Sequence, residues 1–552
     1  MTPGPLLLPR PRHVGPVGSV GDGALPPQGY RLVVGDGGDV HIDAADDAGR
    51  FYAERTLDQL GDAPAPIAIE DWPDVLVRGV MLDVSRDKVP TMATLFALVD
   101  RLAGLKINHL QLYVEHTFAY AGHDDVWRDA SPFTPDEIRS LDAYCAARHV
   151  ELAANQNCLG HMERWLRFDR YRPLAIRPDG WTDRRGRHRD PMTLDPSKPG
   201  AIELVRDLLG QLLANVSSPR VHVGLDEPWE LPDERFDDYL DYVRRLRSVP
   251  ELDGRDMLMW GDVVASHPER VAELPAGVTV CEWGYEAPHP FDARAAALAA
   301  TGLPFWLCPG TSSWNTLGGR WTNMRENVER AATAAITHGA EGVLVTDWGD
   351  NGHLQYLPVS EPGFAWAAAT SWCVDANRNL DLDRVVSVHL FGDDTGEIGA
   401  VLRELGDAHL ALTPQVPNMS VLALPLYVPS VRMGEGFTEG VTDDELVEAK
   451  ARIAAAVAHV GRASPSREDG YLVLDELRAT AELLDLLVDD ARARLAAGGA
   501  IDDVDQRTGA DLVARLDPMV DRHRELWLAR NRPGGLDDSA ARITRLSSLW
   551  RQ

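Results

Sequence analysis

Two adjacent carboxylates, Asp226 and Glu227, end an apolar segment in VHVGLDEPWE. The dipeptide Asp-Glu recurs elsewhere at predicted helices, but only here does it close an apolar segment and meet a proline, Pro228. Consecutive side chains on a strand point to opposite sides, so the pair is not expected to flank one bond as acid and nucleophile. Glu227 is instead a candidate proton donor, and Asp226 a candidate ligand for another part of the same substrate. We favour this interpretation over a carboxylate that caps the next helix.

Arg78 and His161 are two further candidates for the site. Arg78 lies in the apolar segment RGVMLDVSR, where an unpaired guanidinium would be costly to bury. It is expected either to pair with a carboxylate such as Asp347 or to bind substrate hydroxyls, and the pattern leaves both open. His161 follows an apolar segment in NCLGHMERW. A lone histidine in a loop is usually a surface residue, but this position supports the hypothesis of a hydrogen bond near Glu227.

The tryptophans are a third signal. The chain has 15 Trp against 11 Phe, and Trp260, Trp283, Trp314 and Trp348 stand at the ends of four successive apolar segments. Indole rings pack on flat apolar faces, such as those of sugars, and line pockets that contain a few polar groups. Packing within a core is the alternative, although barrel interiors favour Val, Ile and Leu. We therefore expect a sugar-sized pocket.

The elements that must position these residues alternate regularly over residues 76–378. Eight apolar segments alternate with helical patterns, which is the count of a (β/α)8 TIM barrel. An open doubly wound sheet usually carries a Gly-rich first turn, which is missing here. The segments are 75–85, 108–115, 150–157, 220–227, 256–264, 277–284, 304–314 and 342–350.

In such a barrel the carboxyl ends of all strands meet at one mouth, where TIM-barrel enzymes place their sites. Polar and aromatic residues gather at these ends, and they include Asp262 as well as the residues already named. We add Glu115 and Asp347 to the candidate substrate-binding residues for this reason.

Two further regions flank the barrel. Residues 1–75 combine a predicted hairpin over 30–44 with an amphipathic helix and close with a Pro-rich break, so a small α/β domain is expected there. Residues 379–552 are mostly helical patterns without a cluster of catalytic residue types. We expect a helical domain that packs on the barrel or makes a subunit contact, so a homo-oligomer is a candidate assembly.

Composition limits the partners. The net charge of −30 and the pI near 4.9 argue against nucleic acid and anionic membranes. The five cysteines are scattered, and the N-terminal stretch MTPGPLLLPRPRHVGP has no apolar signal-peptide core, so a cytoplasmic location is expected. HExxH, HxH, GxSxG, phosphate-loop and dinucleotide-binding motifs are missing, and we expect neither a metal nor another cofactor.

Over about residues 30–375 the chain resembles glycoside hydrolase family 20, the β-N-acetylhexosaminidases. HVGLDE resembles the HxGGDE signature of that family, LGH its PGH turn, and RGVMLDVSR its first strand. LMWGDVV and CEWG resemble the strands that supply pocket tryptophans. The resemblance implies that Arg78 binds the O3 and O4 hydroxyls of the sugar and that Asp347 stands near the position of a Glu that binds distal hydroxyls in the family. It also implies that Trp314 stands where a Tyr usually holds the acetamide carbonyl.

The resemblance also implies a mechanism and a small glycan or glycoconjugate substrate. The nucleophile would be the 2-acetamido oxygen of the substrate, which is an exception to the scheme of two carboxylates. Glu227 would protonate the leaving oxygen and then activate water, while Asp226 would orient the acetamido group and stabilise an oxazolinium intermediate. Two alternatives stay open: a retaining glycosidase of other specificity, with Glu115 or Asp347 as nucleophile, and a carbohydrate-binding barrel without turnover.

Overall fold

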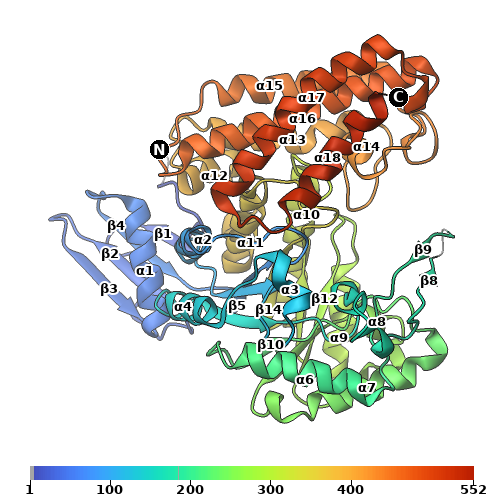
Figure 1. Cartoon of the computed structure of the whole chain (residues 1–552). Helices are drawn as coiled ribbons and strands as arrows, with labels where there is room; N and C mark the ends of the chain where they lie inside the picture. The colour runs from blue at the N-terminus through green and yellow to red at the C-terminus, as the bar shows by residue number, and fades with distance from the viewer. Residues whose placement is uncertain (1–4, 184–185, 552) are drawn as a thin grey trace.

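The computed structural model describes residues 5–183 and 186–551. The first four residues of the N-terminal stretch discussed above therefore lie outside the described residues. Figure 1 shows the three regions: an N-terminal sheet in blue, the barrel in cyan to yellow, and a group of helices in orange and red that covers one side of the barrel.

A small antiparallel sheet with one helix precedes the barrel. Its strands run in the order β1–β4–β2–β3: β1 His13–Gly15, β4 Ile67–Asp71, β2 Tyr30–Val34 and β3 Val40–Ala44, with helix α1 over Asp47–Leu60. The predicted hairpin is confirmed, because β2 and β3 pair in register. Strand β4 differs from the prediction, since it lies in the segment that we interpreted as a break. Pro64 and Pro66 precede the strand and Pro73 follows it, so the strand fits between them, with Ala68 and Ile69 buried between β1 and β2.

The predicted (β/α)8 barrel is confirmed. Eight parallel strands close it in chain order: β5 Val77–Asp83, β6 His109–Tyr113, β7 Glu151–Asn155, β10 Arg220–His222, β11 Asp256–Trp260, β12 Val278–Trp283, β13 Phe305–Cys308 and β14 Gly342–Asp347. The long helices around it are α2 Met92–Gly104, α4 Pro135–Ala146, α6 Pro199–Leu213, α7 Phe236–Arg247, α9 Phe291–Thr301, α10 Trp321–His338 and α11 Leu357–Asn377. Short helices α3 Asp124–Trp127, α5 Glu163–Leu166 and α8 Asp262–Ala265 lie in the loops, and strands β8 Trp181–Thr182 and β9 His188–Arg189 pair in the loop between β7 and α6.

The C-terminal region is helical and packs on the barrel, as expected. Its helices are α12 Leu382–Phe391, α13 Glu397–Asp407, α14 Leu424–Tyr427, α15 Asp443–Val460, α16 Gly470–Ala497, α17 Gln506–Arg530 and α18 Leu536–Trp550. Helix α13 contacts α10, and α16 contacts α11. The end of α17 also reaches the loop after β5, where Thr91 N–H donates to the Arg530 carbonyl at 2.9 Å. A subunit contact through this region stays a prediction.

Alternation along the strands decides which side chains face the barrel interior. Met81 of β5, Trp260 of β11 and Leu344 of β14 belong to one inner cluster. Because successive side chains of a strand point to opposite faces, Arg78 and Asp347 are on the outward-facing sides of their strands. No helix among the described residues has both the length and the apolar character needed to cross a membrane.

Candidate active site

The loops that follow β7 and β10 approach each other closely at Asp226. A Cβ added to Gly160 would lie 2.3 Å from the Asp226 carbonyl oxygen, so glycine is needed for this approach. His161, Leu225 and Glu227 have positive φ angles of 54°, 73° and 45°. Such conformations of non-glycine residues cost about 1–3 kcal/mol each and cluster at functional sites. Three of them in two adjoining loops mark this end of the barrel as the candidate active site.

His161 contacts both predicted catalytic carboxylates. Its Nε2 lies 3.3 Å from Asp226 Oδ2 and 3.5 Å from Glu227 Oε2, so the hypothesis from the sequence agrees with the geometry. Burial disfavours the imidazolium, but the charge of Asp226 and the contacts with both carboxylates raise the pKa of His161 well above its ordinary value. Burial likewise opposes the Asp226 carboxylate, and the charge of His161 lowers the Asp226 pKa despite it. An ionised Asp226 therefore lies beside a protonated His161 at neutral pH.

Asp226 and Glu227 differ in exposure and in hydrogen bonding. The Asp226 side chain is 9% exposed and the Glu227 side chain 29%. Asp226 Oδ1 is buried and has no hydrogen-bond partner on another residue in the part of the chain that the structure describes. One carboxylate thus offers a buried free acceptor, while its neighbour has access to solvent and to a leaving group.

A third carboxylate, Asp262, adjoins this pair and was not among the predicted site residues. Its Oδ2 accepts the Glu227 backbone N–H at 3.0 Å, and its Oδ1 accepts Nε1–H of Trp283 at 3.4 Å. Burial and the charge of Asp226 raise the pKa of Asp262 to about 7. Asp262 therefore fixes the backbone of Glu227 and orients one of the predicted tryptophans. Its signal in the sequence was its place just after a barrel strand, which we noted without assigning a role.

The assignment of Arg78 as a sugar-binding residue is wrong. Arg78 is buried near the amino end of β5, at the opposite end of the strand from the mouth. Its guanidinium donates to the Lys106 carbonyl at 2.9 Å and to the Val75 carbonyl at 2.9 Å, and it lies over the Trp372 ring. The alternative of a bridge to Asp347 is also wrong, because these backbone and aromatic contacts take its place. Arg78 joins the barrel to the N-terminal domain.

Arg86, at the other end of the same sequence segment, is the arginine of the mouth. It donates to Asp83 Oδ2 at 3.0 Å and lies 3.5 Å from Glu115 and 3.6 Å from Asp350. Its guanidinium is stacked over the rings of Tyr113 and Trp348. Burial opposes the cation, but the surrounding acidic groups hold the Arg86 pKa well above its ordinary value. The arginine of this segment that lies at the mouth is thus Arg86 and not the predicted Arg78.

Glu115 lies at the mouth, where it was predicted. Burial raises its pKa to about 7 against the opposing charge of Arg86, and the Tyr113 hydroxyl donates to it at 3.0 Å. Asp350, which was not predicted from the sequence, lies near the same arginine, and its side chain is 39% exposed. Its signal was available in TDWGD, where it stands two residues after Trp348.

The placement of Asp347 in the site is wrong. Its carboxylate is buried on the outer side of β14 and accepts hydrogen bonds from the hydroxyls of Thr311 at 2.8 Å and Ser313 at 2.7 Å. Burial raises its pKa. Asp347 therefore ties two strand ends together and is not available as a nucleophile or as a ligand for hydroxyls.

The four predicted tryptophans do gather in one aromatic cluster. Trp260, Trp314 and Trp348 are buried members, and Trp283 is half-buried against them. Trp283 is stacked on Tyr285 with ring centroids 5.1 Å apart, and Tyr285 makes an edge contact of 5.1 Å with Trp314. The cluster closes the barrel interior below the mouth, and Trp283 is its most accessible ring. The sugar-sized pocket itself stays a prediction.

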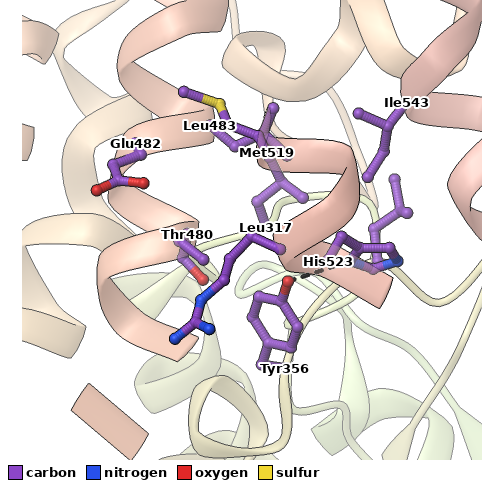
Figure 2. A pocket seen from close by; sticks show the side chains of 11 residues that line it. Leu317, Tyr356, Thr480, Glu482, Leu483, Met519, His523 and Ile543 are labelled. Atoms are coloured by element: carbon purple, nitrogen blue, oxygen red, sulfur yellow. Dashed lines mark hydrogen bonds between the residues drawn. The ribbon is translucent and has the colours of Figure 1, made fainter. Parts of the chain in front are cut away.

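Figure 2 shows a different pocket, away from these residues. It is lined by side chains of α16, α17 and α18 and of the loops after β13 and β14, such as Leu317, Thr480 and Met519. Inside it the Tyr356 hydroxyl and His523 Nδ1 are hydrogen-bonded at 3.1 Å. None of the predicted site residues lines it. Among the described residues no three His, Cys, Asp or Glu side chains are grouped to hold a metal ion.

The fold and the mouth together define a (β/α)8 barrel whose mouth carries paired carboxylates above an aromatic floor. Comparison with known proteins then specifies the family. Residues 77–327 match the family model described as glycosyl hydrolase family 20, catalytic domain. The match spans the barrel strands from β5 to β13, and it confirms the resemblance inferred from the sequence.

Named relatives are distant. Beta-hexosaminidase 1 of Coccidioides posadasii is 23% identical over 332 residues, which are 53% of this chain and 53% of that protein. Hexosaminidase D of Bos taurus is 22% identical over 52% of this chain and 90% of that protein. A solved family 20 beta-N-acetylglucosaminidase superposes with a TM-score of 0.54 at 21% identity, over 67% of this chain and 91% of that chain. The chain thus spans about half the length of the first of these relatives, and the likeness to the solved structure shows the fold.

Proposed function

We propose that this protein is a retaining exo-glycosidase that removes terminal β-linked N-acetylhexosamine by substrate-assisted catalysis. The observation that carries the proposal is the pair Asp226 and Glu227, in which a buried ionised carboxylate with a free oxygen adjoins a more exposed carboxyl group. Such a pair serves two different roles on one substrate, because one member orients a polar group while the other transfers a proton.

Glu227 is the proposed general acid and base. It protonates the glycosidic oxygen as the acetamido oxygen attacks the anomeric carbon, and it then removes a proton from the water that opens the oxazolinium ring. Asp262 supports this role by accepting the Glu227 backbone N–H. Both proton transfers need the carboxyl group at a fixed place, which the hydrogen bond supplies.

Asp226 is the proposed partner of the acetamido group. Its Oδ1 is the free acceptor for the acetamido N–H, and its Oδ2 is held by His161. The negative charge stabilises the positive charge that develops on the oxazolinium, in a setting where water screens little. His161 is thus a positioning residue for Asp226.

Arg86 and Asp350 are the proposed ligands for the distal hydroxyls. They form an ion pair of 3.6 Å on the same side of the mouth, and Asp350 is 39% exposed. A guanidinium donates to sugar hydroxyls and a carboxylate accepts from them, so the pair can bind two neighbouring hydroxyls. This assignment replaces Arg78 and Asp347.

The first experiment compares the release of nitrophenol from β-linked sugars with and without a 2-acetamido group. Substrate-assisted catalysis predicts turnover of the N-acetyl sugars and little of the matching glucoside. Turnover of both would favour a conventional retaining glycosidase, with Glu115 left as the nucleophile after the correction of Asp347. Binding without turnover would favour a carbohydrate-binding barrel.

We also propose a cytoplasmic location, which the free, buried cysteines support. Fractionation of the native host with an antibody against the chain tests it, and recovery outside the membrane-enclosed cytoplasm would contradict it.

A further inference from the structure

Trp229 is an exposed indole next to the candidate acid. All fifteen tryptophans of the chain lie in the described residues, and Trp229 is the only exposed one, with 58% of its surface accessible. It follows Glu227 by two residues in the loop after β10. Tryptophan offers two broad apolar faces, and leaving them in water forgoes the free energy that burial gives. This exposure occurs beside the active site and not on a remote surface.

The turn that carries Trp229 is anchored on both sides. The Trp229 N–H donates to the Glu227 carbonyl at 2.7 Å. The next residue, Glu230, is buried, and its Oε2 accepts the backbone N–H groups of Met192 at 2.9 Å and Thr193 at 2.7 Å. The indole is therefore presented by a fixed backbone, which reduces the entropy lost when a ligand packs on it.

A second indole lies next to the first. Trp181 and Trp229 have ring centroids 6.5 Å apart at 59°, although they come from different loops of the mouth. Trp181 belongs to the hairpin of β8 and β9, which projects from the barrel in Figure 1. The Asp183 carboxylate stiffens this hairpin by accepting from Arg187 at 2.9 Å and Arg189 at 3.1 Å. Nε1 of Trp181 is buried without a hydrogen-bond partner among the described residues, so it is free to take one.

The reaction places the leaving group on this side of the mouth. Glu227 protonates the oxygen between the terminal sugar and the next unit, so that unit must extend past Glu227 toward solvent. Trp229 is the first exposed side chain after Glu227 in the same loop. A pyranose ring has one apolar face of C–H groups, which matches the flat face of an indole in size and character.

We propose that Trp229, supported by Trp181, is the binding platform for the sugar ring to which the terminal N-acetylhexosamine is linked. The inference rests on the proposed function, because only a glycosidase has such a leaving group. It extends that function to the substrate class: the enzyme prefers oligosaccharides to N-acetylhexosamine carried directly on a non-sugar group.

The test distinguishes binding of the second sugar from binding of the terminal sugar. The kcat/KM of Trp229→Ala is measured on the β-linked disaccharide of N-acetylglucosamine and on β-N-acetylglucosaminyl fluoride, whose leaving group is a single atom. We expect the loss on the disaccharide to exceed the loss on the fluoride by about tenfold, with Trp229→Phe intermediate and Trp181→Ala smaller. Tyr471→Ala, which removes an aromatic ring that is 89% exposed on α16, is the matched control and should change neither value.

Equal losses on both substrates, or no loss on either, would overturn the platform while the proposed function stands. Hydrolysis of neither substrate by the wild type would instead remove the proposed function. The platform is then judged by calorimetric titration with the disaccharide: weaker binding to Trp229→Ala than to the wild type supports it, and equal or undetectable binding overturns it.

Discussion

Replacing Asp226 by Asn tests the electrostatic part of the mechanism. The amide has nearly the shape of the carboxylate but lacks its charge, so the acetamido group loses its ionised partner and His161 loses the charge that raises its pKa. We expect turnover of N-acetyl substrates to fall and the pKa of His161 to move down toward its ordinary value. Both effects have one cause, the removal of a charge that burial leaves poorly screened.

The contact with His161 sets the scale of the loss. At the 3.3 Å that separates His161 Nε2 from Asp226 Oδ2, two unit charges attract by about 5 kcal/mol if the effective dielectric constant is about 20. A cationic oxazolinium at a similar distance would gain a comparable energy, of which the amide dipole keeps a part. Removing one preorganised group from a developing charge typically costs about 2.7–4 kcal/mol, or about 10²–10³-fold in kcat. We expect a loss in that range.

The assay compares kcat for a nitrophenyl N-acetylglucosaminide with the Ki of a thiazoline-fused sugar, which mimics the cationic intermediate. Both should worsen together in Asp226→Asn, while Asp233→Asn, an exposed carboxylate in the same loop, should leave both unchanged. Proton titration of His161 by NMR follows the predicted fall of its pKa. An unchanged thiazoline Ki in the variant, together with a glycosyl ester on Glu115 after trapping with a 2-fluoro sugar, would refute the reasoning.

Three further predictions follow from the same geometry. Glu227→Gln should lower kcat by about 10²–10⁴-fold on a substrate with a poor leaving group and leave binding nearly intact, and near-normal turnover would contradict it. Arg86→Ala should raise KM about tenfold or more, because the sugar hydroxyls lose a charged donor. Arg78→Ala should leave KM unchanged and lower the free energy of unfolding by about 3 kcal/mol, because the carbonyls of Lys106 and Val75 lose their donor. Urea unfolding and kinetics of both variants check this contrast. Burial lowers the pKa of Lys88 to about 7, so from pH 7 to about 10 the unfolded chain holds a proton that the folded chain has released, and stability should rise with pH. Lys88→Met should lose that rise. If the urea midpoints of the wild type and of Lys88→Met change equally between pH 7 and pH 9.5, the role of Lys88 in the pH dependence is excluded.

The sequence by itself determined the barrel and indicated the candidate pair at its mouth. Eight apolar segments alternate with helical patterns, and this alternation is a local property that does not depend on the tertiary contacts. Asp226 and Glu227 were likewise identified from their position at the end of a strand, because the ends of parallel strands meet at one mouth in every closed barrel. His161 and the four tryptophans came from the same argument.

Only the tertiary structure decided which neighbours of these residues reach the mouth. Barrel strands are buried on both faces and read as continuous apolar runs, so the sequence does not show which face of a strand points inward. An error of one position turns a side chain to the other face. For this reason Asp347 was placed in the site although it faces outward, while Asp350, which lies at the mouth beside Arg86, was missed.

The position of the mouth along a strand is also hidden in the sequence, and this is why Arg78 and not Arg86 was predicted to lie there. Both stand in one short motif, and the sequence contains no measure of how far along β5 the mouth begins. The strand's pairing with β14 and β6 fixes that level, and it leaves Arg78 among the carbonyls of the amino end and Arg86 among the acidic groups of the mouth. Strand pairing is a long-range property, so the sequence shows the motif but does not show which of its two arginines lies at the mouth.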